Sequence, residues 1–424
     1  MIPLSLAAYR LATAAAAPLA GALLSLRLNR GKEDPDRIDE RRGRPGLPRP
    51  EGPLVWLHGA SVGETVSLLP LVERLTQRGL FALVTSGTVT SARLMAERLP
   101  TRAVHQFIPL DTARFMRAFL KHWRPDLGLF AESEIWPNMI LEAARAKTPL
   151  ALVNARMSAR SFHRWRRMSG AARALFSRFD ATLAQTPGDA ERLTALGSPQ
   201  APVIGNLKFD APPPPGDPYE LAELSGLVAG RRLWIAASTH PGEERIAAET
   251  HLRLAAEFPD LLTLIAPRHP ERGQAVAAEI AALGLACGRR SQGARPGRDV
   301  SVYVCDTMGE LGLFYRLAGI AFLGKSLTGG GGQNPIEPAK LGAALLHGPR
   351  VGNFADVYAP LDAEGGALLV NDANELSVAL ATLFGNPGRV REGARAAARV
   401  VERGAGAVER TLAALEPQLA ALRR

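Results

Sequence analysis

Cysteine is nearly absent from this chain of 424 residues, which contains only Cys287 and Cys305. The two lie far apart in the sequence and form no CxxC pair, which argues against a zinc ribbon and against a disulfide framework. A chain with so few thiols suits a reducing compartment. With 46% hydrophobic and 22% charged residues, the chain is predicted to fold, and it is not expected to be a multi-spanning membrane protein.

Metal-binding signatures are also scarce. The sequence contains no HExxH zinc motif. Its only DxD motif is Asp34-Pro35-Asp36, which falls in a segment of mixed charge, proline and glycine. A metal-dependent transferase built on a DxD site is therefore disfavoured, and we expect neither a metal nor a cofactor.

The net charge of +10 suits an acidic partner such as nucleic acid, anionic lipid or a nucleotide sugar. Most basic residues are single arginines within helical segments, and there is no zinc finger, RNP-like sequence or interleaving of aromatic and basic residues. We therefore expect no nucleic-acid partner.

The amino terminus carries an apolar signal. Residues 11–26 hold no charge and lie between Arg10 and a basic cluster at Arg27, Arg30 and Lys32. Sixteen residues is short for a membrane span. We expect residues 1–30 to form an uncleaved anchor or an interfacial helix, since basic residues after an apolar run favour retention on the cytoplasmic side. A cleaved signal peptide and a soluble packing helix are the alternatives.

The length suits two domains of roughly 150 to 200 residues. Residues 31–53 mix charge with Pro and Gly and predict a tether. Over 54–210, strand and helix signals alternate as PLVWLHGAS, VGETVSLLPLVERLTQRG and LFALVTSG, and further strands are expected in DLGLFAES, TPLALVNAR and ATLAQT. Near-continuous apolar strands separated by helices are typical of a parallel sheet covered on both faces. This half is predicted to form one Rossmann-like domain.

A proline-rich run at 211–218 predicts a stiff linker. After it, over 219–424, the alternation restarts with strands in RRLWIAAST, LLTLIAPRH, VYVCDT, GIAFLGKS and AALLHGP. We therefore predict an α/β protein of the GT-B fold, with two Rossmann-like domains that face each other across a cleft. Ligand groups are expected on the loops after the carboxyl ends of the strands.

The first candidate site is WLHGASVGE, where Glu64 follows a strand and begins a helix. Ser61-x-x-Glu64 is a capping-box pattern, in which the glutamate satisfies backbone N–H groups at the helix start. A carboxylate at such a loop is also placed to act as a general base, which takes a proton from an attacking hydroxyl. Local sequence leaves both interpretations open.

Two further candidates lie in the first half. LFAESEIWPN puts Glu132 and Glu134 after an apolar strand, where they are either helix-start acids or groups for sugar binding and transition-state support. GNLKFD places Lys208 between apolar residues near the predicted domain junction. A cation there could meet a carboxylate or phosphate of a bound donor.

In the second half, AASTHPGEE follows a strand with Ser238, Thr239 and His240, and IAPRHPER follows another with Arg268 and His269. We expect hydroxyls and backbone N–H groups at the first of these places, and the Arg268 cation at the second, to be offered to a bound anion. The strongest local pattern is LTGGGGQNPIEPAK, in which glycines 329–332 allow close approach of the backbone to a ligand. There Asn334 is expected to cap a helix, Pro335 suits its first turn, and Glu337 is expected to accept from ribose hydroxyls.

These motifs together resemble the 3-deoxy-manno-octulosonic acid (Kdo) transferases of lipopolysaccharide assembly. The resemblance covers nearly the whole chain. It rests on ten stretches and on the order in which they follow one another. They are WLHGASVGE, PLDTARFMRAFLKHWRPDL, ESEIWPN, NARMSARSF, AQTPGDAERL, GNLKFD, ASTHPGEE, APRHPER, DTMGELGLFY and GGQNPIEPA.

The resemblance implies an inverting, metal-independent transfer of Kdo from CMP-Kdo to a hydroxyl of a lipid A precursor (lipid IVA), at the cytoplasmic face of the inner membrane. Glu64 matches the family's general base, and Glu134 and Lys208 match positions that support the transition state. The resemblance also implies that 54–210 is the acceptor domain and 219–424 the CMP-sugar-binding domain. The residues that match CMP-binding segments are Arg268, His269, Met308, Gly309, Glu310, Asn334, Pro335, Ile336 and Glu337. Gln333 departs from the family, since many relatives carry His there, so a titratable role at that position is lost.

Two other functions compete with this one. A GT-B enzyme that uses another nucleotide sugar, such as lipid A disaccharide synthase or a sugar 2-epimerase, would be separated by a donor screen. A membrane-bound lipopolysaccharide-binding or scaffold protein would bind the lipid A precursor without releasing CMP from CMP-Kdo.

Overall fold

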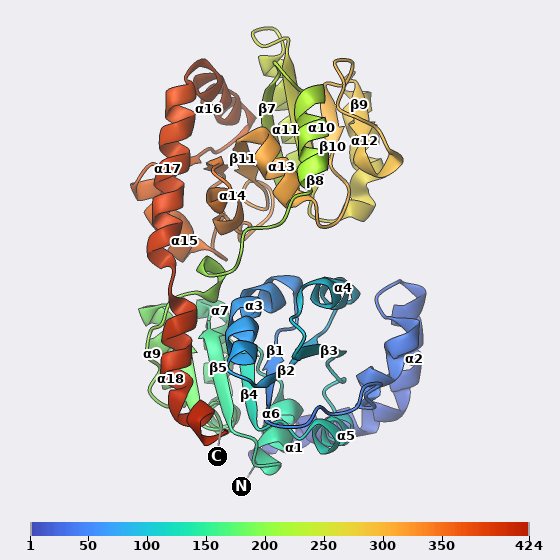
Figure 1. Ribbon diagram of the computed structural model, residues 1–424, viewed down its shortest axis with the longest axis vertical. Coiled ribbons are helices and arrows are strands. Elements are labelled where there is room, and N and C mark those ends of the chain that lie inside the picture. The colour runs from blue at the N-terminus through green and yellow to red at the C-terminus, as the bar shows by residue number, and fades with distance from the viewer. Residues whose placement is uncertain (1, 423–424) are drawn as a thin grey trace. The chain divides into compact units, whose positions relative to one another are not determined.

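The computed structural model describes residues 2–422. The chain divides into two compact units (Figure 1). Unit 1 comprises Met1–Ala211 and Ala405–Arg424, and unit 2 comprises Pro212–Gly404. Each unit is built on its own parallel sheet, as the alternating strand and helix signals predict.

Unit 1 holds a six-stranded sheet in the order β3-β2-β1-β4-β5-β6, and all of its strand pairs are parallel. Neighbours β1 and β4 are where the strand order changes direction, which is the place where such sheets bind ligands. The strands are β1 (Leu54–His58), β2 (Phe81–Ser86), β3 (Ala103–Phe107), β4 (Leu127–Ala131), β5 (Leu150–Ala155) and β6 (Ala181–Ala184).

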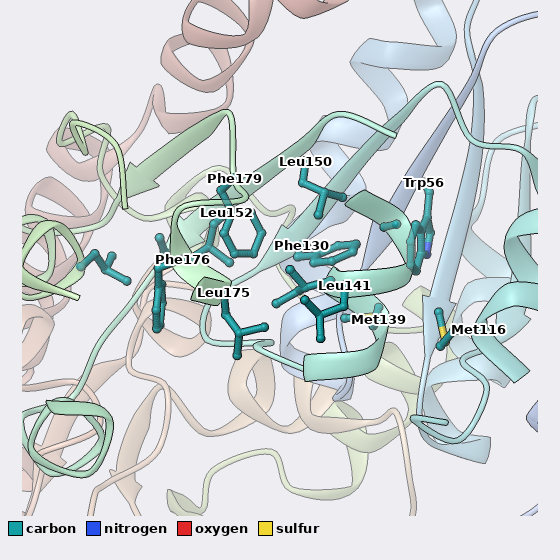
Figure 2. Close-up of a cluster of buried hydrophobic side chains, with 14 of the residues drawn as sticks. Trp56, Met116, Phe130, Met139, Leu141, Leu150, Leu152, Leu175, Phe176 and Phe179 are labelled. Carbon is teal, nitrogen blue, oxygen red and sulfur yellow. The ribbon is translucent and has the colours of Figure 1, made fainter. Parts of the chain in front are cut away.

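Helices cover both faces of this sheet, and each face has its own apolar cluster. In the cluster of Figure 2, the ring of Phe130 lies 4.8 Å from that of Trp56 and 6.1 Å from that of Phe179. The helices are α3 (Val62–Gln77), α4 (Val89–Arg98), α5 (Ala113–Trp123), α6 (Pro137–Arg145), α7 (Ala159–Arg167), α8 (Ser169–Phe176), α9 (Pro187–Ala195), η3 (Leu207–Phe209) and α18 (Ala407–Ala421).

The apolar amino-terminal segment forms α1 (Leu4–Ala16), η1 (Ala17–Leu19) and α2 (Ala20–Asn29). By length and composition, Leu4–Asn29 qualifies as a candidate membrane span. Its polar residues are nevertheless bonded to unit 1: the Tyr9 hydroxyl donates to Asp111 at 2.9 Å, and the Arg10 guanidinium lies 2.5 Å from the Glu142 carboxylate. The segment therefore has one side fixed to the protein and another side exposed.

Residues 31–53, which we expected to be a tether, are packed on the sheet instead. They include the 3₁₀ helix η2 (Pro35–Arg42), and the side chains of Glu33, Glu40 and Arg41 are buried. The helix ends at Gly43, where φ is 76° and a Cβ atom would lie 2.1 Å from the Phe115 carbonyl oxygen. The charges that suggested a solvated segment bond to one another and to the chain.

Unit 2 holds a seven-stranded parallel sheet in the order β13-β12-β11-β7-β8-β10-β9, which changes direction between β7 and β11. The strands are β7 (Arg232–Thr239), β8 (Leu261–Pro267), β9 (Cys287–Arg289), β10 (Val302–Val304), β11 (Ile320–Leu323), β12 (Ala344–His347) and β13 (Ala367–Leu369). The helices are α10 (Pro218–Leu227), α11 (Glu243–Leu254), η4 (Pro270–Arg272), α12 (Gly273–Ala282), η5 (Arg290–Gln292), α13 (Leu311–Ala318), α14 (Ile336–Lys340), α15 (Ala355–Ala363), α16 (Ala373–Gly385) and α17 (Pro387–Gly404).

Both expected ends of the second domain differ from the structure. Unit 2 stops at Gly404, because α18 buries Leu412, Leu415 and Leu419 in a core cluster of unit 1. The Asp210 carboxylate fixes the start of this helix by accepting from the backbone N–H groups of Gly406 and Val408, both at 2.6 Å. We expected the second domain to run over 219–424, and this boundary is wrong: unit 2 comprises Pro212–Gly404.

The proline run at 211–218 is also more firmly held than a free linker. The Arg316 guanidinium donates to the Pro214 carbonyl at 2.8 Å. At Gly312, in α13, a Cβ atom would lie 2.1 Å from the Pro215 carbonyl oxygen, so only glycine permits this contact. Most of the run belongs to unit 2.

Candidate active site

The side chains predicted for catalysis gather at the carboxyl ends of β1 and β4 in unit 1. Glu64 lies in the first turn of α3, and its position is fixed by a complete capping box with Ser61. The Glu64 Oε2 atom accepts from the backbone N–H groups of Ala60 at 2.6 Å and Ser61 at 3.1 Å. Gly59 makes this loop possible, since a Cβ atom there would lie 2.9 Å from the Cβ of Glu64. The capping interpretation of Glu64 is therefore correct as geometry.

The surroundings of Glu64 favour its protonated form. Burial raises the pKa of this carboxyl group, and the negative charges of Glu134 and Glu132 raise it further. The Ser61 N–H and the charge of His58 oppose these effects without cancelling them. A carboxylate with a raised pKa is a better proton acceptor than a solvated one, which is a property that a general base needs.

Glu134 has the opposite balance. Burial raises its pKa, but a hydrogen bond from His58, the charge of His58 and a hydrogen bond from Trp136 together lower it below its usual value. The His58 Nε2 atom lies 3.5 Å from Glu134 Oε2, and the Trp136 indole donates to the same oxygen at 2.5 Å. Glu134 and Glu64 thus have pKa values that move apart, as is typical of carboxylates with different roles in one site.

Lys208 is brought to the same edge of the sheet, where its ammonium group lies 2.5 Å from Glu132 Oε1. Glu132 has a φ of 53°, a left-handed backbone conformation that is uncommon for a residue with a side chain. Asn154, with a φ of 49°, accepts from the Leu207 N–H through Oδ1 at 3.0 Å and so holds the segment that carries Lys208. The cation predicted here has a carboxylate partner within the protein.

His58 and Asn154 are functional candidates that the sequence patterns did not reveal. His58 is fully buried, and its Nδ1 atom lies 2.9 Å from the Thr85 hydroxyl, which orients the ring toward Glu134. In the sequence, His58 is only the last residue of an apolar strand. Its one available signal was a polar residue at a strand end.

In unit 2, several predicted CMP-binding residues line one small pocket with a volume of about 60 Å³. It lies beside the carboxyl ends of β7, β8 and β10, and Ser238 in its wall has a φ of 55°. Residues in the lining that matter for an anionic ligand are Ser238, Arg268, Thr307, Met308 and Gly309.

Positive charge gathers around His240 near this pocket. The pKa of His240 is lowered by burial first and then by the charges of Lys325, His269 and Arg268, with Glu243 opposing. The His240 and His269 rings lie 6.0 Å apart. Lys325, which the sequence analysis did not single out, has a left-handed φ of 57° directly after β11. This group of cations is suited to phosphate.

The backbone around this group is organised by Glu243 rather than left open for an anion. The buried Glu243 carboxylate accepts from the N–H groups of His240, Lys325, Ser326 and Leu327 at 2.6 to 3.0 Å. The Thr239 hydroxyl donates to Glu244 at 2.9 Å. The expectation that residues 238–240 offer free donors to an anion is therefore wrong for His240 N–H and Thr239, because these donors stabilise two buried carboxylates.

The remaining predicted CMP contacts hold turns in shape. Glu310 pairs with Arg290 at 2.6 Å, and this bond with that from Thr307 outweighs burial and lowers the pKa of Glu310. Asn334 lies one residue before the N-cap of α14, which is Pro335, so it is not the cap residue that we expected. Its Oδ1 accepts from the Ile336 N–H at 3.1 Å, and its amide donates to Glu337 at 3.2 Å. Pro335 and Ile336 are buried, so their side chains contribute packing.

Comparison with known proteins identifies the family. The chain is 34% identical over 377 residues to the 3-deoxy-D-manno-octulosonic acid transferase of Rickettsia bellii, an alignment that covers 88% of this chain and 90% of that protein. The chain belongs to the Kdo transferase family. Residues 36–211 match the family model described as 3-Deoxy-D-manno-octulosonic-acid transferase (kdotransferase). The protein is therefore a glycosyltransferase.

Solved structures show the same fold at low identity. A glycosyltransferase from Rickettsia africae aligns with a TM-score of 0.59 at 12% identity, over 87% of this chain and 99% of that chain. A UDP-GlcNAc 2-epimerase from Neisseria meningitidis, bound to UDP-GlcNAc, aligns with a TM-score of 0.58 at 14% identity, over 86% of this chain and 100% of that chain. The predicted GT-B fold class is confirmed.

Proposed function

We propose that the protein transfers Kdo from CMP-Kdo to a hydroxyl of a lipid A precursor, lipid IVA, with inversion at the anomeric carbon, as a step of lipopolysaccharide core assembly. The observation that carries the proposal is the Glu64 carboxylate, whose pKa is raised by burial and by Glu134 and Glu132 at the direction change of the sheet. Family membership supplies the transferred sugar.

Glu64 serves as both helix cap and general base. Both capping N–H groups donate to its Oε2 atom, so Oε1 is the oxygen offered to an acceptor hydroxyl. As the acceptor oxygen bonds to the anomeric carbon of Kdo, its proton passes to Glu64. The bond from that carbon to the CMP phosphate breaks at the opposite face, and its electron pair leaves with the phosphate.

Glu134 and Lys208 support the transition state. The hydrogen bonds from Trp136 and His58 lower the pKa of Glu134 and keep it ionised, which suits it to stabilise positive charge that develops on the sugar ring. Lys208, held by Glu132, adds a cation for the Kdo carboxylate.

Arg268, His269 and Lys325 meet the phosphate of CMP, and Met308 and Gly309 line the pocket beside them. The segment Asn334–Glu337 supplies a capped turn and the Glu337 carboxylate for ribose hydroxyls. Glu310 acts by fixing Arg290. No step in this scheme uses a metal or a cofactor.

The amino-terminal helices attach the protein to the cytoplasmic face of the inner membrane. Their outward side carries Leu4, Leu11 and Leu19, which are 89%, 73% and 68% exposed. The exposed basic residues Arg30 and Lys32 follow, where anionic headgroups would meet them. We expect detergent, and not high salt alone, to release the protein from membranes. Full recovery in the soluble fraction at low salt would contradict this attachment.

An assay of CMP release, with and without lipid IVA and followed by mass spectrometry of the lipid, tests the proposed reaction. We expect release that depends on the acceptor, a lipid heavier by one or more Kdo residues, and the same rate in excess EDTA. Transfer from a UDP-sugar instead, or acceptor binding with no CMP release, would favour one of the two competing functions. A loss of rate in EDTA that magnesium restores would overturn metal independence.

A further inference from the structure

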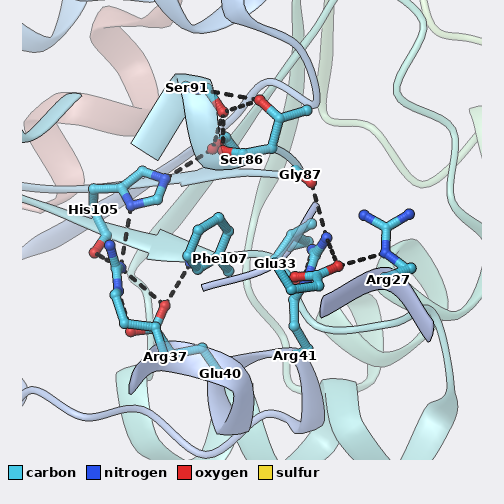
Figure 3. Close-up of polar contacts among 12 residues, drawn as sticks. Arg27, Glu33, Arg37, Glu40, Arg41, Ser86, Gly87, Ser91, His105 and Phe107 are labelled. Atoms are coloured by element: carbon cyan, nitrogen blue, oxygen red, sulfur yellow. Dashed lines mark hydrogen bonds and ion pairs between the residues drawn. The ribbon is translucent and has the colours of Figure 1, made fainter. Parts of the chain in front are cut away.

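The packed segment that connects the amino-terminal helices to β1 contains a buried network of charges (Figure 3). Glu33 and Arg41 form its centre, with side chains only 1% and 5% exposed. The Arg41 guanidinium meets both Glu33 oxygens, at 2.9 and 3.0 Å. Arg27, in the last turn of α2, adds a contact to Glu33 at 2.5 Å. A buried ion pair of this kind stabilises a fold poorly compared with apolar residues.

The Arg41 guanidinium also donates hydrogen bonds to two loops of the sheet. Its Nη1 atom donates to the Ile108 carbonyl at 2.7 Å, and its Nη2 atom donates to the Gly87 carbonyl at 2.8 Å. Ile108 follows β3, and Gly87 follows β2. Both therefore lie at the carboxyl ends of strands, the edge at which Glu64 also lies.

The backbone of Gly87 continues the connection to Glu64. The Gly87 N–H donates to the Ala60 carbonyl at 3.1 Å, and the Ser61 N–H, which belongs to the same peptide group as that carbonyl, donates to Glu64 Oε2 at 3.1 Å. A guanidinium, the Gly87 backbone, the Ala60–Ser61 peptide group and a carboxylate thus form one hydrogen-bonded series. Because a peptide group is planar and rigid, the bond from Gly87 to the Ala60 carbonyl also fixes the direction of the Ser61 N–H.

We propose that Arg41, oriented by Glu33, is a positioning residue for the reaction: it holds the Gly87 backbone and, through the Ala60–Ser61 peptide group, the carboxylate of Glu64. This inference rests on the proposed role of Glu64 as the base. Arg41 touches neither donor nor acceptor. Its loss displaces the base from the acceptor hydroxyl, and small displacements of a reacting group cost rate steeply.

Arg37 provides a matched control. It lies on the same 3₁₀ helix, pairs with Glu40 at 2.9 Å and donates to the His105 carbonyl at 2.8 Å. These contacts tie it to β3, and none of them includes Gly87. Replacing Arg37 removes a partly buried arginine from the same network without breaking the series that ends at Glu64.

The test compares Arg41→Gln, Arg41→Lys and Arg37→Gln at saturating CMP-Kdo and acceptor, with rates corrected for the folded fraction. We expect Arg41→Gln to lower kcat tenfold or more and to leave the KM for CMP-Kdo within twofold. Arg41→Lys should give an intermediate kcat, because an ammonium group can replace only part of the forked contacts. Arg37→Gln should keep kcat within twofold.

Gly87→Ala keeps the test decisive if Arg41→Gln fails to fold. The added Cβ atom would lie 3.1 Å from the Ala60 carbonyl oxygen, so it displaces that peptide and leaves the ion network intact. We expect a several-fold loss of kcat with little change in Tm. The inference is overturned if both Arg41→Gln and Gly87→Ala keep kcat within twofold while Glu64→Gln is inactive. An active Glu64→Gln would instead overturn the proposed function.

Discussion

The Nε2 atom of His58 lies 3.5 Å from Oε2 of Glu134, at the end of a strand that also leads into the loop before Glu64. This contact helps to give the carboxyl groups of Glu134 and Glu64 different pKa values. His58 and Trp136 lower the pKa of Glu134, and the charge that Glu134 keeps raises the pKa of Glu64. The site therefore holds one carboxylate that stays ionised and another suited to accept a proton.

Removal of the charge on Glu134 should shift the pH profile. The pKa of Glu64 is raised by burial and by the charges of Glu134 and Glu132, and it is lowered by the Ser61 N–H and by His58. In Glu134→Gln the contribution of the Glu134 charge is lost, so the acid limb of kcat/KM should move to lower pH, whatever happens to the maximal rate. Profiles of kcat/KM against pH for both proteins measure the shift. An acid limb that stays in place or moves to higher pH would mean that Glu64 does not set it.

A double mutant distinguishes the contribution of Lys208 to stability, through its ion pair with Glu132, from its contribution to activity. Lys208→Met leaves the Glu132 carboxylate, which is 12% exposed, without its ammonium partner, and should cost about 1–3 kcal/mol of unfolding free energy. Adding Glu132→Gln should restore part of that stability, because the unpaired charge is gone. It should not restore activity if Lys208 contacts the donor. Denaturant melts and kcat, measured on the wild type and on both variants, test this. Recovery of stability and activity together would reduce Lys208 to an ion-pair partner.

Arg268 is expected to bind the CMP phosphate. Arg268→Ala should weaken CMP binding by about tenfold to a hundredfold, since one charge-assisted hydrogen bond contributes about 1.5–3 kcal/mol. Titration calorimetry with CMP at low and moderate salt measures the effect. Arg253→Ala, an exposed arginine on α11, is the control and should leave the affinity unchanged. Equal losses in the two variants would indicate only a general effect of net charge.

His105 should make stability depend on pH. Burial, with the charges of Arg37 and Arg41, lowers its pKa to about 3. Between the unfolded value of about 6.5 and pH 3, the unfolded chain binds a proton at this residue and the folded protein does not. The contribution of His105 to the free energy of unfolding is therefore complete above pH 6.5. It falls as the pH decreases, by up to about 1.4 kcal/mol per pH unit. In His105→Asn, unfolding free energies measured from pH 7 to pH 5 should show a correspondingly smaller slope; an unchanged slope would mean that His105 is not buried in its neutral form.

Local patterns were sufficient for some of these features. Most strands of the two sheets are buried apolar runs bounded by Gly, Pro or polar residues, so their order along the chain predicts two Rossmann-like units. Strands β3, β9 and β13 are less buried, and the sequence pattern did not predict them. Asn334 could be placed near a helix start from its neighbours alone, because a helix start depends on a few consecutive residues.

Features that depend on distant partners were missed. The amphipathic pattern of α18 shows an apolar face but not which sheet receives it, and that helix joins unit 1 through Asp210. The charges of residues 31–53 suggest a solvated segment, whereas Glu33 and Arg41 satisfy each other. Asn154 and Lys325 depend on left-handed backbone conformations that their sequence neighbours do not reveal.

Turnover of Glu64→Gln tests the central claim most directly. The substitution keeps an oxygen that can accept from Ala60 and Ser61. The free energy of unfolding should therefore fall by no more than the loss of a cap would cause, about 0.5–2 kcal/mol. Glu73→Gln, an exposed position on the same helix, controls for the loss of one charge. We predict that Glu64→Gln binds CMP-Kdo within about twofold of the wild type and lowers kcat by roughly a hundredfold to ten-thousandfold, while Glu73→Gln stays fully active. If Glu64→Gln turned over within a few-fold of the wild type at saturating substrates, with chemistry rate-limiting, Glu64 would be a helix cap only and the base would lie elsewhere.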